Sequence, residues 1–346
     1  MTKHHIENSG RTWKRGNLRS SVVNKSSHTY FDTYFDLDKA PTCPYELPFI
    51  YAGRITMNIL SKAVVYSRMI KFSHTVFALP FALSSIVLVQ RAKPLDFATV
   101  FWIIIAMVGA RSAAMGFNRI ADAAIDAKNP RTAAREIPKG VISRGEATFF
   151  TLIASVVFIS ASAMLSPWCF WLSFPVLALF FTYSYMKRVT WLAHLILGFA
   201  IGMVPMAVWV AVTGALPGMI SVLSLALMTY IAGFDILYAC QDIEFDRAMG
   251  LHSIPASFGV GKAMEISSFL HGISALSLLS LYWLFPLSPV YLFVVGIIAF
   301  LFFVEHKLVN PDDLSKIDMA FFHVNSLISI LVLVAILSGS MLRGIL

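Results

Sequence analysis

The sequence contains two clusters of acidic residues whose spacing follows the turns of a helix. In the first, Arg111, Asn118, Asp122 and Asp126 fall within an arc of roughly 80° on a helix with 3.6 residues per turn. Carboxylate oxygens at a helix end suit Mg2+, which takes a few protein oxygens and completes its shell with water and substrate phosphates. The spacing therefore favours a magnesium and phosphate site, although an ordinary helix end with solvated charges would explain it equally well.

Basic residues follow the first cluster and recur in a later segment. Arg131 and Arg135 come shortly after Asp126, and Lys187 and Arg188 close the stretch YSYMKR. Guanidinium groups match phosphate oxygens in geometry, and ammonium groups bind them as point charges. These cations predict a site for a diphosphate. For the pair at 187 and 188, retention of positive charge on the cytoplasmic side of a membrane is an equal alternative.

The second acidic cluster lies near the end of a long apolar run. Asp235, Tyr238, Asp242 and Asp246 share one face of a helix, and an acid such as Asp235 inside an apolar run is costly and is functional by default. Alone, this cluster could be an acidic face that pairs with Lys or Arg of the loops. Two acidic clusters that face each other repel unless cations lie between them, so together they predict two Mg2+ ions that bridge a diphosphate.

The elements that must position these residues are membrane helices. Apolar residues make up 58% of the 346 residues and charged residues only 13%, whereas a soluble domain is roughly 25% charged. This composition, with a mean hydropathy of +0.73, excludes a water-soluble globule. We expect an all-α, multi-pass membrane protein of about nine helices, because nine apolar runs are each long enough to cross ~30 Å of hydrocarbon. The nine runs are residues 72–90, 97–117, 147–165, 168–184, 192–213, 217–238, 263–284, 288–304 and 320–341.

Charge is distributed unevenly among the connections between these runs. The links after the second, fourth, sixth and eighth runs hold nearly all of the loop charge. Because Lys and Arg are retained on the cytoplasmic side, we expect the N-terminus and both acidic clusters to face the cytoplasm and the C-terminus to lie outside. The net charge of +8 then reflects orientation, and we expect no nucleic-acid partner. Residues 1–60 are polar and predict a disordered cytoplasmic extension without a cleavable signal peptide, which leaves residues 61–346 as the transmembrane domain.

The first acidic cluster resembles a motif of the UbiA superfamily of intramembrane aromatic prenyltransferases, and the resemblance extends over roughly residues 66–342. The family's motif N-D-x-x-D-x-x-x-D is matched by Asn118, Asp122 and Asp126, but Arg119 stands where the family has an Asp. That difference removes one possible metal ligand and adds a cation. The family's stretch N-P-R-T-x-x-R is also present after the motif.

The later motifs of the family are similar to segments of this chain as well. The pattern D-x-x-Y-A-x-x-D-x-x-x-D is matched by the second acidic cluster, and Y-P-x-x-K-R is similar to residues 183–188, with Ser184 in place of the Pro. The resemblance implies metal ligands at Asp122, Asp126, Asp242 and Asp246. The diphosphate-binding residues that it implies are Asn118, Arg131, Arg135, Lys187 and Arg188. The residues that would handle the second substrate are Asp235, Arg111 and Tyr238, although Arg111 could equally pair with an acid of the sixth run.

The reaction that the resemblance implies is a Mg2+-dependent transfer of a polyprenyl group from polyprenyl diphosphate to an aromatic hydroxy acid. It would take place in the lipid bilayer of the inner (plasma) membrane, on the cytoplasmic face, in ubiquinone or menaquinone biosynthesis. The acceptor we expect is 4-hydroxybenzoate, and the alternative is a 1,4-dihydroxynaphthoate (1,4-dihydroxy-6-naphthoate) of menaquinone synthesis. A distant alternative from another class is a secondary transporter, which predicts ionisable residues near the bilayer midplane and broken helices. His194 and His323 are better explained as helix-end histidines than as catalysts.

Overall fold

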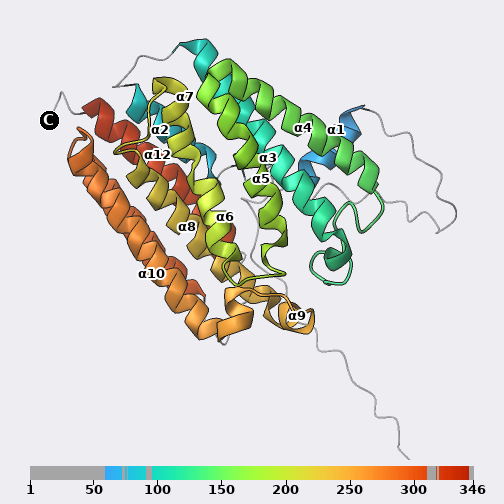
Figure 1. Ribbon diagram of the computed structural model, residues 1–346. Coiled ribbons are helices and arrows are strands. Elements are labelled where there is room, and N and C mark those ends of the chain that lie inside the picture. Colours follow the sequence, from blue (N-terminus) through green and yellow to red (C-terminus); the bar gives the residue numbers. More distant parts are fainter. Residues whose placement is uncertain are drawn as a thin grey trace, which may run out of the picture. The chain divides into compact units, whose positions relative to one another are not determined.

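The structure, a computed structural model, describes residues 59–71, 75, 77–90, 96–309, 317 and 319–342. Every regular element within these ranges is a helix (Figure 1), so the expected all-α class is confirmed. The extension predicted over residues 1–60 lies outside the described residues apart from its last two positions. The disorder expected there therefore stays a prediction.

Eight helical segments among the described residues are long and apolar enough to cross a membrane, close to the nine expected. They are α3 (Phe97–Asp126), α4 (Arg144–Leu165), α5 (Pro167–Met186), α6 with α7 (Ala193–Gly202 and Val204–Thr213), α8 with η2 and α9 (Ser221–Ala239, Cys240–Asp242 and Ile243–Ala248), α10 (Ile254–Leu284), α11 (Val290–Leu308) and η3 with α12 (Met319–Val324 and Asn325–Met341). The run expected over 72–90 forms the shorter helix α2 (Leu79–Val89), with Pro80 in its first turn. Helix α1 (Ile59–Met69) precedes it.

Helix α3 carries the first acidic cluster and extends beyond the apolar run that predicted it. It begins at a cap in which the Asp96 carboxylate accepts a hydrogen bond from the backbone N–H of Thr99 (2.6 Å). It packs closely against α4. The close approach is seen at Gly109, where an added Cβ would lie only 2.8 Å from the backbone nitrogen of Phe158. The apolar run ends near residue 117, yet the helix continues to Asp126. These last polar turns present the acids at the helix end.

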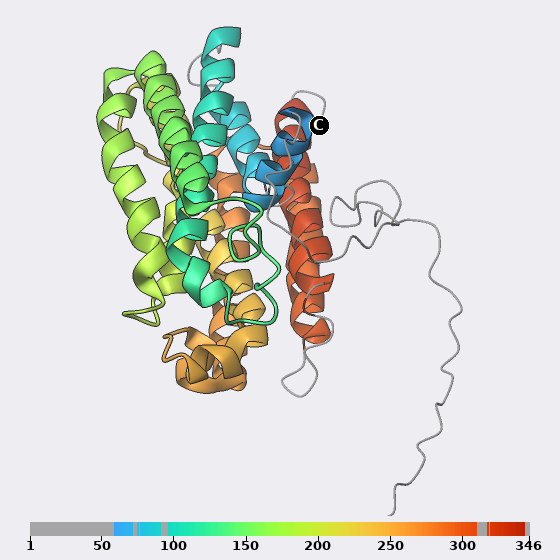
Figure 2. The same cartoon turned by 90° about the vertical axis from the view of Figure 1, so that its right-hand side faces the viewer.

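Helix α8 carries the start of the second acidic cluster and forms the centre of the bundle. Most of its side chains are buried, since α6, α10 and α2 pack around it. The apolar core on this side includes Leu227, Tyr230 and Ile231 of α8, with Phe81 of α2 and Leu278 of α10. Figures 1 and 2 show that α9 and the loop after α3 lie toward the same end of the bundle. Both acidic clusters therefore lie toward one end of the protein.

A buried polar network joins four helices away from the acidic clusters. The Tyr230 hydroxyl donates to the backbone oxygen of Asn325 (2.6 Å), and the Asn325 amide donates to Glu305 (2.7 Å). His271 lies beside Glu305, with its Nδ1 3.4 Å from the second carboxylate oxygen. All four side chains are buried. The network links α8, α10, α11 and α12, which holds the helix behind the second cluster in place.

Helix α6 approaches α8 unusually closely at two glycines. A Cβ at Gly198 would lie 2.4 Å from the Met228 carbonyl oxygen and 2.8 Å from Ala232 Cβ, and a Cβ at Gly202 would lie 2.6 Å from Met228 Cβ. Small residues at a helix interface allow the backbones to come this near in membrane proteins. The glycines therefore set the distance between the two helices.

A Gly198→Ala substitution is expected to destabilise the protein by about 1–3 kcal/mol, because the added methyl group overpacks the α6–α8 interface. Thermal unfolding of the detergent-solubilised protein, followed by circular dichroism, measures the effect. The control is Gly272→Ala in α10, where a Cβ meets nothing within 4 Å and where Ala is the better helix former. Equal stability of the two variants would contradict the close contact.

Candidate active site

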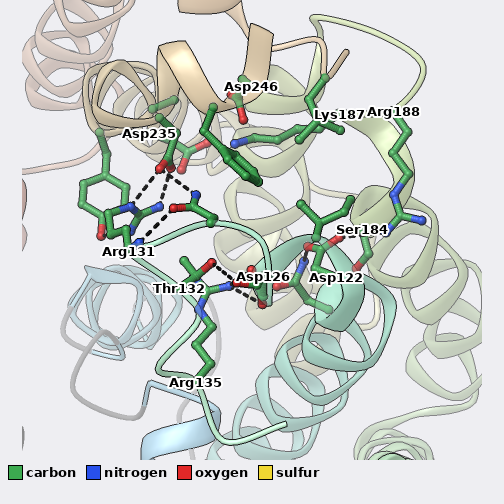
Figure 3. A pocket seen from close by; sticks show the side chains of 18 of the residues that line it. Asp122, Asp126, Arg131, Thr132, Arg135, Ser184, Lys187, Arg188, Asp235 and Asp246 are labelled. Carbon is green, nitrogen blue, oxygen red and sulfur yellow. Dashed lines mark hydrogen bonds and ion pairs between the residues drawn. The ribbon is translucent and has the colours of Figure 1, made fainter. Parts of the chain in front are cut away.

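The two acidic clusters lie on facing walls of one pocket (Figure 3). The walls come from the last turns of α3, the loop that follows it, the end of α5 and the segment from α8 to α9. Every predicted site residue lines this pocket except Arg111. The structure thus brings together eleven side chains that were predicted to act together, while the role of each one stays a prediction.

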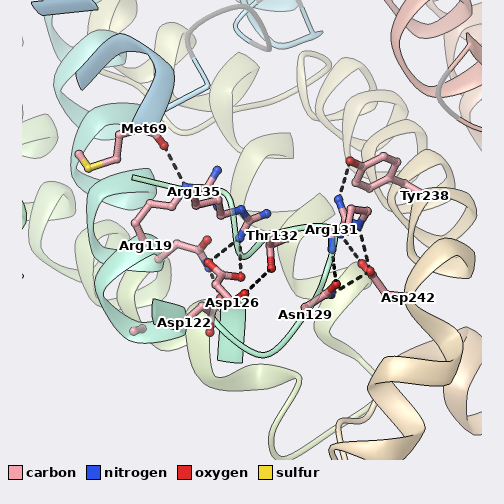
Figure 4. A network of polar contacts seen from close by, with 12 residues as sticks. Met69, Arg119, Asp122, Asp126, Asn129, Arg131, Thr132, Arg135, Tyr238 and Asp242 are labelled. Carbon is pink, nitrogen blue, oxygen red and sulfur yellow. Dashed lines mark hydrogen bonds and ion pairs between the residues drawn. The ribbon is translucent and has the colours of Figure 1, made fainter. Parts of the chain in front are cut away.

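The loop after α3 folds back across the helix end because of local side-chain contacts (Figure 4). The Asn129 side-chain oxygen accepts a hydrogen bond from the backbone N–H of Arg131 (2.9 Å), which is the contact of an Asx turn. The Thr132 hydroxyl donates to the backbone oxygen of Asp126 (3.2 Å). This turn sends the side chains of Arg131 and Arg135 to acids of different clusters.

Arg131 joins the first motif to the second. Its Nε donates to Asp242 Oδ1 (2.9 Å), and its Nη2 forms an ion pair with Asp242 Oδ2. Its Nη1 donates to the Tyr238 hydroxyl (2.8 Å), and the Asn129 amide also donates to Asp242 Oδ1 (3.1 Å). A two-pronged guanidinium–carboxylate contact is the strongest common form of charged hydrogen bond. Asp242, which is only 7% exposed, is therefore fully engaged by residues of the first motif's loop.

The two acids of the first cluster are also paired with arginines. Arg135 Nη1 lies 2.7 Å from each carboxylate oxygen of Asp126. Arg188 Nη2 lies 3.0 Å from Asp122 Oδ1, and the Asn118 amide donates to Asp122 Oδ2 (2.9 Å). The cations that were predicted to bind phosphate thus hold the acids that were predicted to bind metal.

Asp246 differs from these three acids. It is 3% exposed, and its Oδ2 has no hydrogen-bond partner among the described residues. The Lys187 side chain extends into the pocket on the same side (Figure 3). The backbone oxygen of Lys187 accepts a hydrogen bond from the backbone N–H of His252 (2.6 Å), which fixes the end of α5 against the loop after α9. Asp246 is thus a buried carboxylate whose Oδ2 is available to bind a metal ion.

Asp235 lies on the α8 wall of the pocket and contacts a residue that motif spacing did not select. His194 Nδ1 lies 2.7 Å from Asp235 Oδ2. The His194 side chain is fully buried, whereas the Asp235 side chain is 20% exposed. His194 is 41 residues away in the chain, so only the packing of α6 against α8 reveals this partner.

Two arginines of α3 point to the end of α1 rather than into the pocket. Arg111 Nη2 donates to the backbone oxygen of Lys71 (2.9 Å), and Arg119 Nε donates to that of Met69 (2.9 Å). Arg111 shares a face with Asn118, but seven residues of helix place it about 10 Å further along the axis. Neither lines the pocket. Arg119, at the position where the family motif has an acid, therefore directs its side chain to the end of α1.

The donor set of the pocket fits a hard divalent cation. In the described part of the chain, no three His, Cys, Asp or Glu side chains are arranged as a metal site, and arginines pair with three of the pocket acids. The available ligands are carboxylate and amide oxygens, the donors that Mg2+ prefers. Asp246 Oδ2, which has no hydrogen-bond partner among the described residues, could bind a metal ion without first losing such a partner. The acids therefore suit Mg2+ once their guanidinium partners move to an anion.

Comparison with known proteins identifies the family of this chain. The UbiA prenyltransferase family matches residues 78–327. The 4-hydroxybenzoate octaprenyltransferase of Serratia proteamaculans is 37% identical over 150 residues, which are 43% of this chain and 51% of that protein, so this match spans about half of the relative's length. The 4-hydroxybenzoate octaprenyltransferase of Vibrio atlanticus is 28% identical over 242 residues, 70% of this chain and 84% of that one.

Solved structures share the fold. A UbiA homologue from Aeropyrum pernix in its apo form has a TM-score of 0.69 and 31% identity, over 76% of this chain and 97% of that chain. A UbiA homologue from Archaeoglobus fulgidus bound to DMAPP and Mg2+ has a TM-score of 0.63 and 16% identity, over 79% and 98% of the two chains. With its all-helical membrane fold and two acidic motifs on one pocket, this chain belongs to the UbiA prenyltransferase family.

Proposed function

We propose that the protein transfers a polyprenyl group from polyprenyl diphosphate to 4-hydroxybenzoate, a step of ubiquinone synthesis in the inner membrane. The observation that carries the proposal is the single pocket in which the acids and cations of both motifs face each other. Relatives that bear the name 4-hydroxybenzoate octaprenyltransferase support this acceptor. Membership of a prenyltransferase family removes the alternative of a secondary transporter.

The metal-binding residues in this proposal are the four pocket acids. Mg2+ held by Asp122, Asp126, Asp242 and Asp246 would offset the charge that develops on the diphosphate as it leaves. The phosphate oxygens would contact the neighbouring amide and cations: Asn118, Arg131, Arg135, Lys187 and Arg188. Arg131 has a particular part, since the guanidinium that now holds Asp242 can turn its donors to a phosphate with the same two-pronged geometry.

The surroundings of the pocket suit a substrate with an apolar tail and a charged head. The pocket lies at the ends of apolar helices, so a polyprenyl chain can stay in lipid while its diphosphate reaches water. We place this end of the protein on the cytoplasmic face, with the N-terminus cytoplasmic, from the charge of the loops. Residues 61–346 form the catalytic transmembrane domain in this proposal, and residues 1–60 an extension.

The proposal predicts prenyl transfer by membranes that contain the protein. Radiolabelled 4-hydroxybenzoate, a polyprenyl diphosphate and Mg2+ should yield a labelled product that extracts into organic solvent and that vector-only membranes do not form. A parallel reaction with 1,4-dihydroxy-6-naphthoate tests the alternative acceptor. Product from the naphthoate alone would overturn the proposed acceptor, and no product from either acid with folded protein would overturn the proposed reaction.

A further inference from the structure

We propose that Asp235 takes the hydroxyl proton of the aromatic acceptor and that His194 positions Asp235 by donating a hydrogen bond from its Nδ1–H. The inference rests on the proposed function and adds to it the site where the acceptor is activated. His194 is the new element, since it belongs to neither acidic motif and does not line the pocket. The Nδ1–Oδ2 distance of 2.7 Å is that of a strong charge-assisted hydrogen bond.

In the Asp235–His194 pair, His194 contacts Oδ2 of the carboxylate, and Asp235 still lines the pocket where a substrate could bind. Asp235 lines the pocket with a side chain that is 20% exposed, while the His194 side chain behind it is completely buried. Among the described residues, the contact of Asp235 with His194 uses Oδ2 and leaves Oδ1 toward the pocket. Asp235 is therefore the member of the pair that an acceptor hydroxyl can reach, and His194 acts through it.

The contacts of His194 assign its tautomer. Its Nε2 is buried and has no hydrogen-bond partner among the described residues. A buried N–H without an acceptor is costly, so the hydrogen belongs on Nδ1, where it is donated to Asp235. While Nδ1–H stays hydrogen-bonded to Oδ2, Asp235 can accept the proton of the acceptor at Oδ1.

Close helix packing holds the pair in this geometry. His194, Gly198 and Gly202 lie one turn apart on one face of α6, and Met228, Ala232 and Asp235 lie on the facing side of α8. The two glycines bring the helix backbones together, with Cβ positions 2.4 and 2.6 Å from atoms of Met228. The imidazole one turn before Gly198 therefore reaches the carboxylate one turn after Ala232. On this interface a fixed imidazole replaces solvent as the partner of the acid.

The proton transfer balances with the prenyl transfer. The acceptor O–H gives its proton to Asp235, and the electron pair that stays on oxygen is delocalised to the ring carbon beside it. This carbon forms the new C–C bond to the first carbon of the prenyl group, while the C–O bond to the diphosphate breaks and its electron pair leaves with the diphosphate. The ring carbon then loses its hydrogen as H+ to water, and Asp235 returns its proton to the acceptor oxygen.

His194→Leu is the decisive variant because leucine has no N–H donor for Asp235. We expect its kcat to fall by about 10²-fold, at the lower end of the 10²–10⁴-fold range of general base catalysis, with the KM for polyprenyl diphosphate unchanged. His194→Gln, which keeps an N–H donor for Asp235, should retain most of the wild-type rate. The matched control is His323→Gln, an exposed histidine at the start of the last span, which should keep the wild-type rate.

A second readout separates the positioning of the base from a purely structural role. With 3-fluoro-4-hydroxybenzoate, whose hydroxyl is more acidic, less of the rate depends on the base, so the ratio of wild-type to His194→Leu activity should shrink several-fold. An unchanged ratio, or a His194→Leu variant within 3-fold of the wild type, would overturn the role of His194. If the wild type forms no product with any hydroxy-aromatic acid, the proposed function fails instead. Thermal unfolding of each variant confirms that the compared proteins are folded.

Discussion

Asp242→Asn is expected to lower the rate of prenyl transfer by on the order of 10²–10³-fold, the size of effect that follows the loss of one preorganised charge at a reacting group. The change replaces a single oxygen by NH2, so packing in the pocket is preserved. It removes the negative charge that two arginine nitrogens and the Asn129 amide now contact. It also replaces a proposed Mg2+ ligand by a weaker one.

Initial rates at saturating concentrations of both substrates measure this effect. The matched control is Glu244→Gln on α9. Glu244 lies two residues after Asp242, is exposed and does not line the pocket. The control should keep nearly the full rate. If Asp242→Asn were as active as the control, Asp242 would have no part in catalysis, and the metal site would have to be reassigned among the other pocket acids.

Removal of divalent metal is expected to stop the reaction and to leave the fold intact. With EDTA in excess we expect the rate to fall by at least about 10³-fold, because metal stabilisation of the departing charge contributes several kcal/mol. Added Mg2+ should restore the rate. The fold should survive because Arg131, Arg135 and Arg188 already neutralise Asp242, Asp126 and Asp122, so the acids do not repel one another when the metal is gone.

Two measurements on one sample test this prediction. Prenyl transfer is followed with and without EDTA, and the unfolding temperature is recorded in the same two buffers. Loss of activity at a constant unfolding temperature supports a catalytic metal. Full activity in EDTA would contradict the metal assignment, and a large drop in unfolding temperature would mean that the metal is structural instead.

Residue spacing was sufficient to predict the two walls of the pocket. A helix repeats its faces every three to four residues, so Asn118, Asp122 and Asp126 on one helix and Asp235 and Asp242 on another could be grouped without any structure. The alternation of charged and uncharged links then placed both groups toward one end of the bundle. The apolar runs also predict the all-helical fold of the described residues, since backbone N–H and C=O groups in lipid must form hydrogen bonds within the chain.

Contacts between distant segments could not be predicted in the same way. The pairing of Arg131 with Asp242 depends on a turn at Asn129 that crosses the pocket, and the pairing of His194 with Asp235 depends on two glycines that bring helices together. Neither depends on a repeat along one helix. The position of Arg111 outside the pocket lining was missed for a related reason, because an angle around the axis does not show how deep along the axis a side chain lies; its role in binding the acceptor stays a prediction.

The pairing of Asp122, Asp126 and Asp242 with arginines has a consequence for how the substrates enter. If Asp242 turns to a metal, the guanidinium of Arg131 loses an anion, and if Arg131 turns to a phosphate, the carboxylate of Asp242 loses a cation. Each change is costly alone, and the two together exchange one set of ionic contacts for another. Under the proposed function, binding of the metal and of the diphosphate would therefore be thermodynamically coupled, so that each would raise the affinity of the pocket for the other by the same factor. Such a protein would discriminate against an uncomplexed diphosphate or a lone cation through the ion pairs that its own residues form.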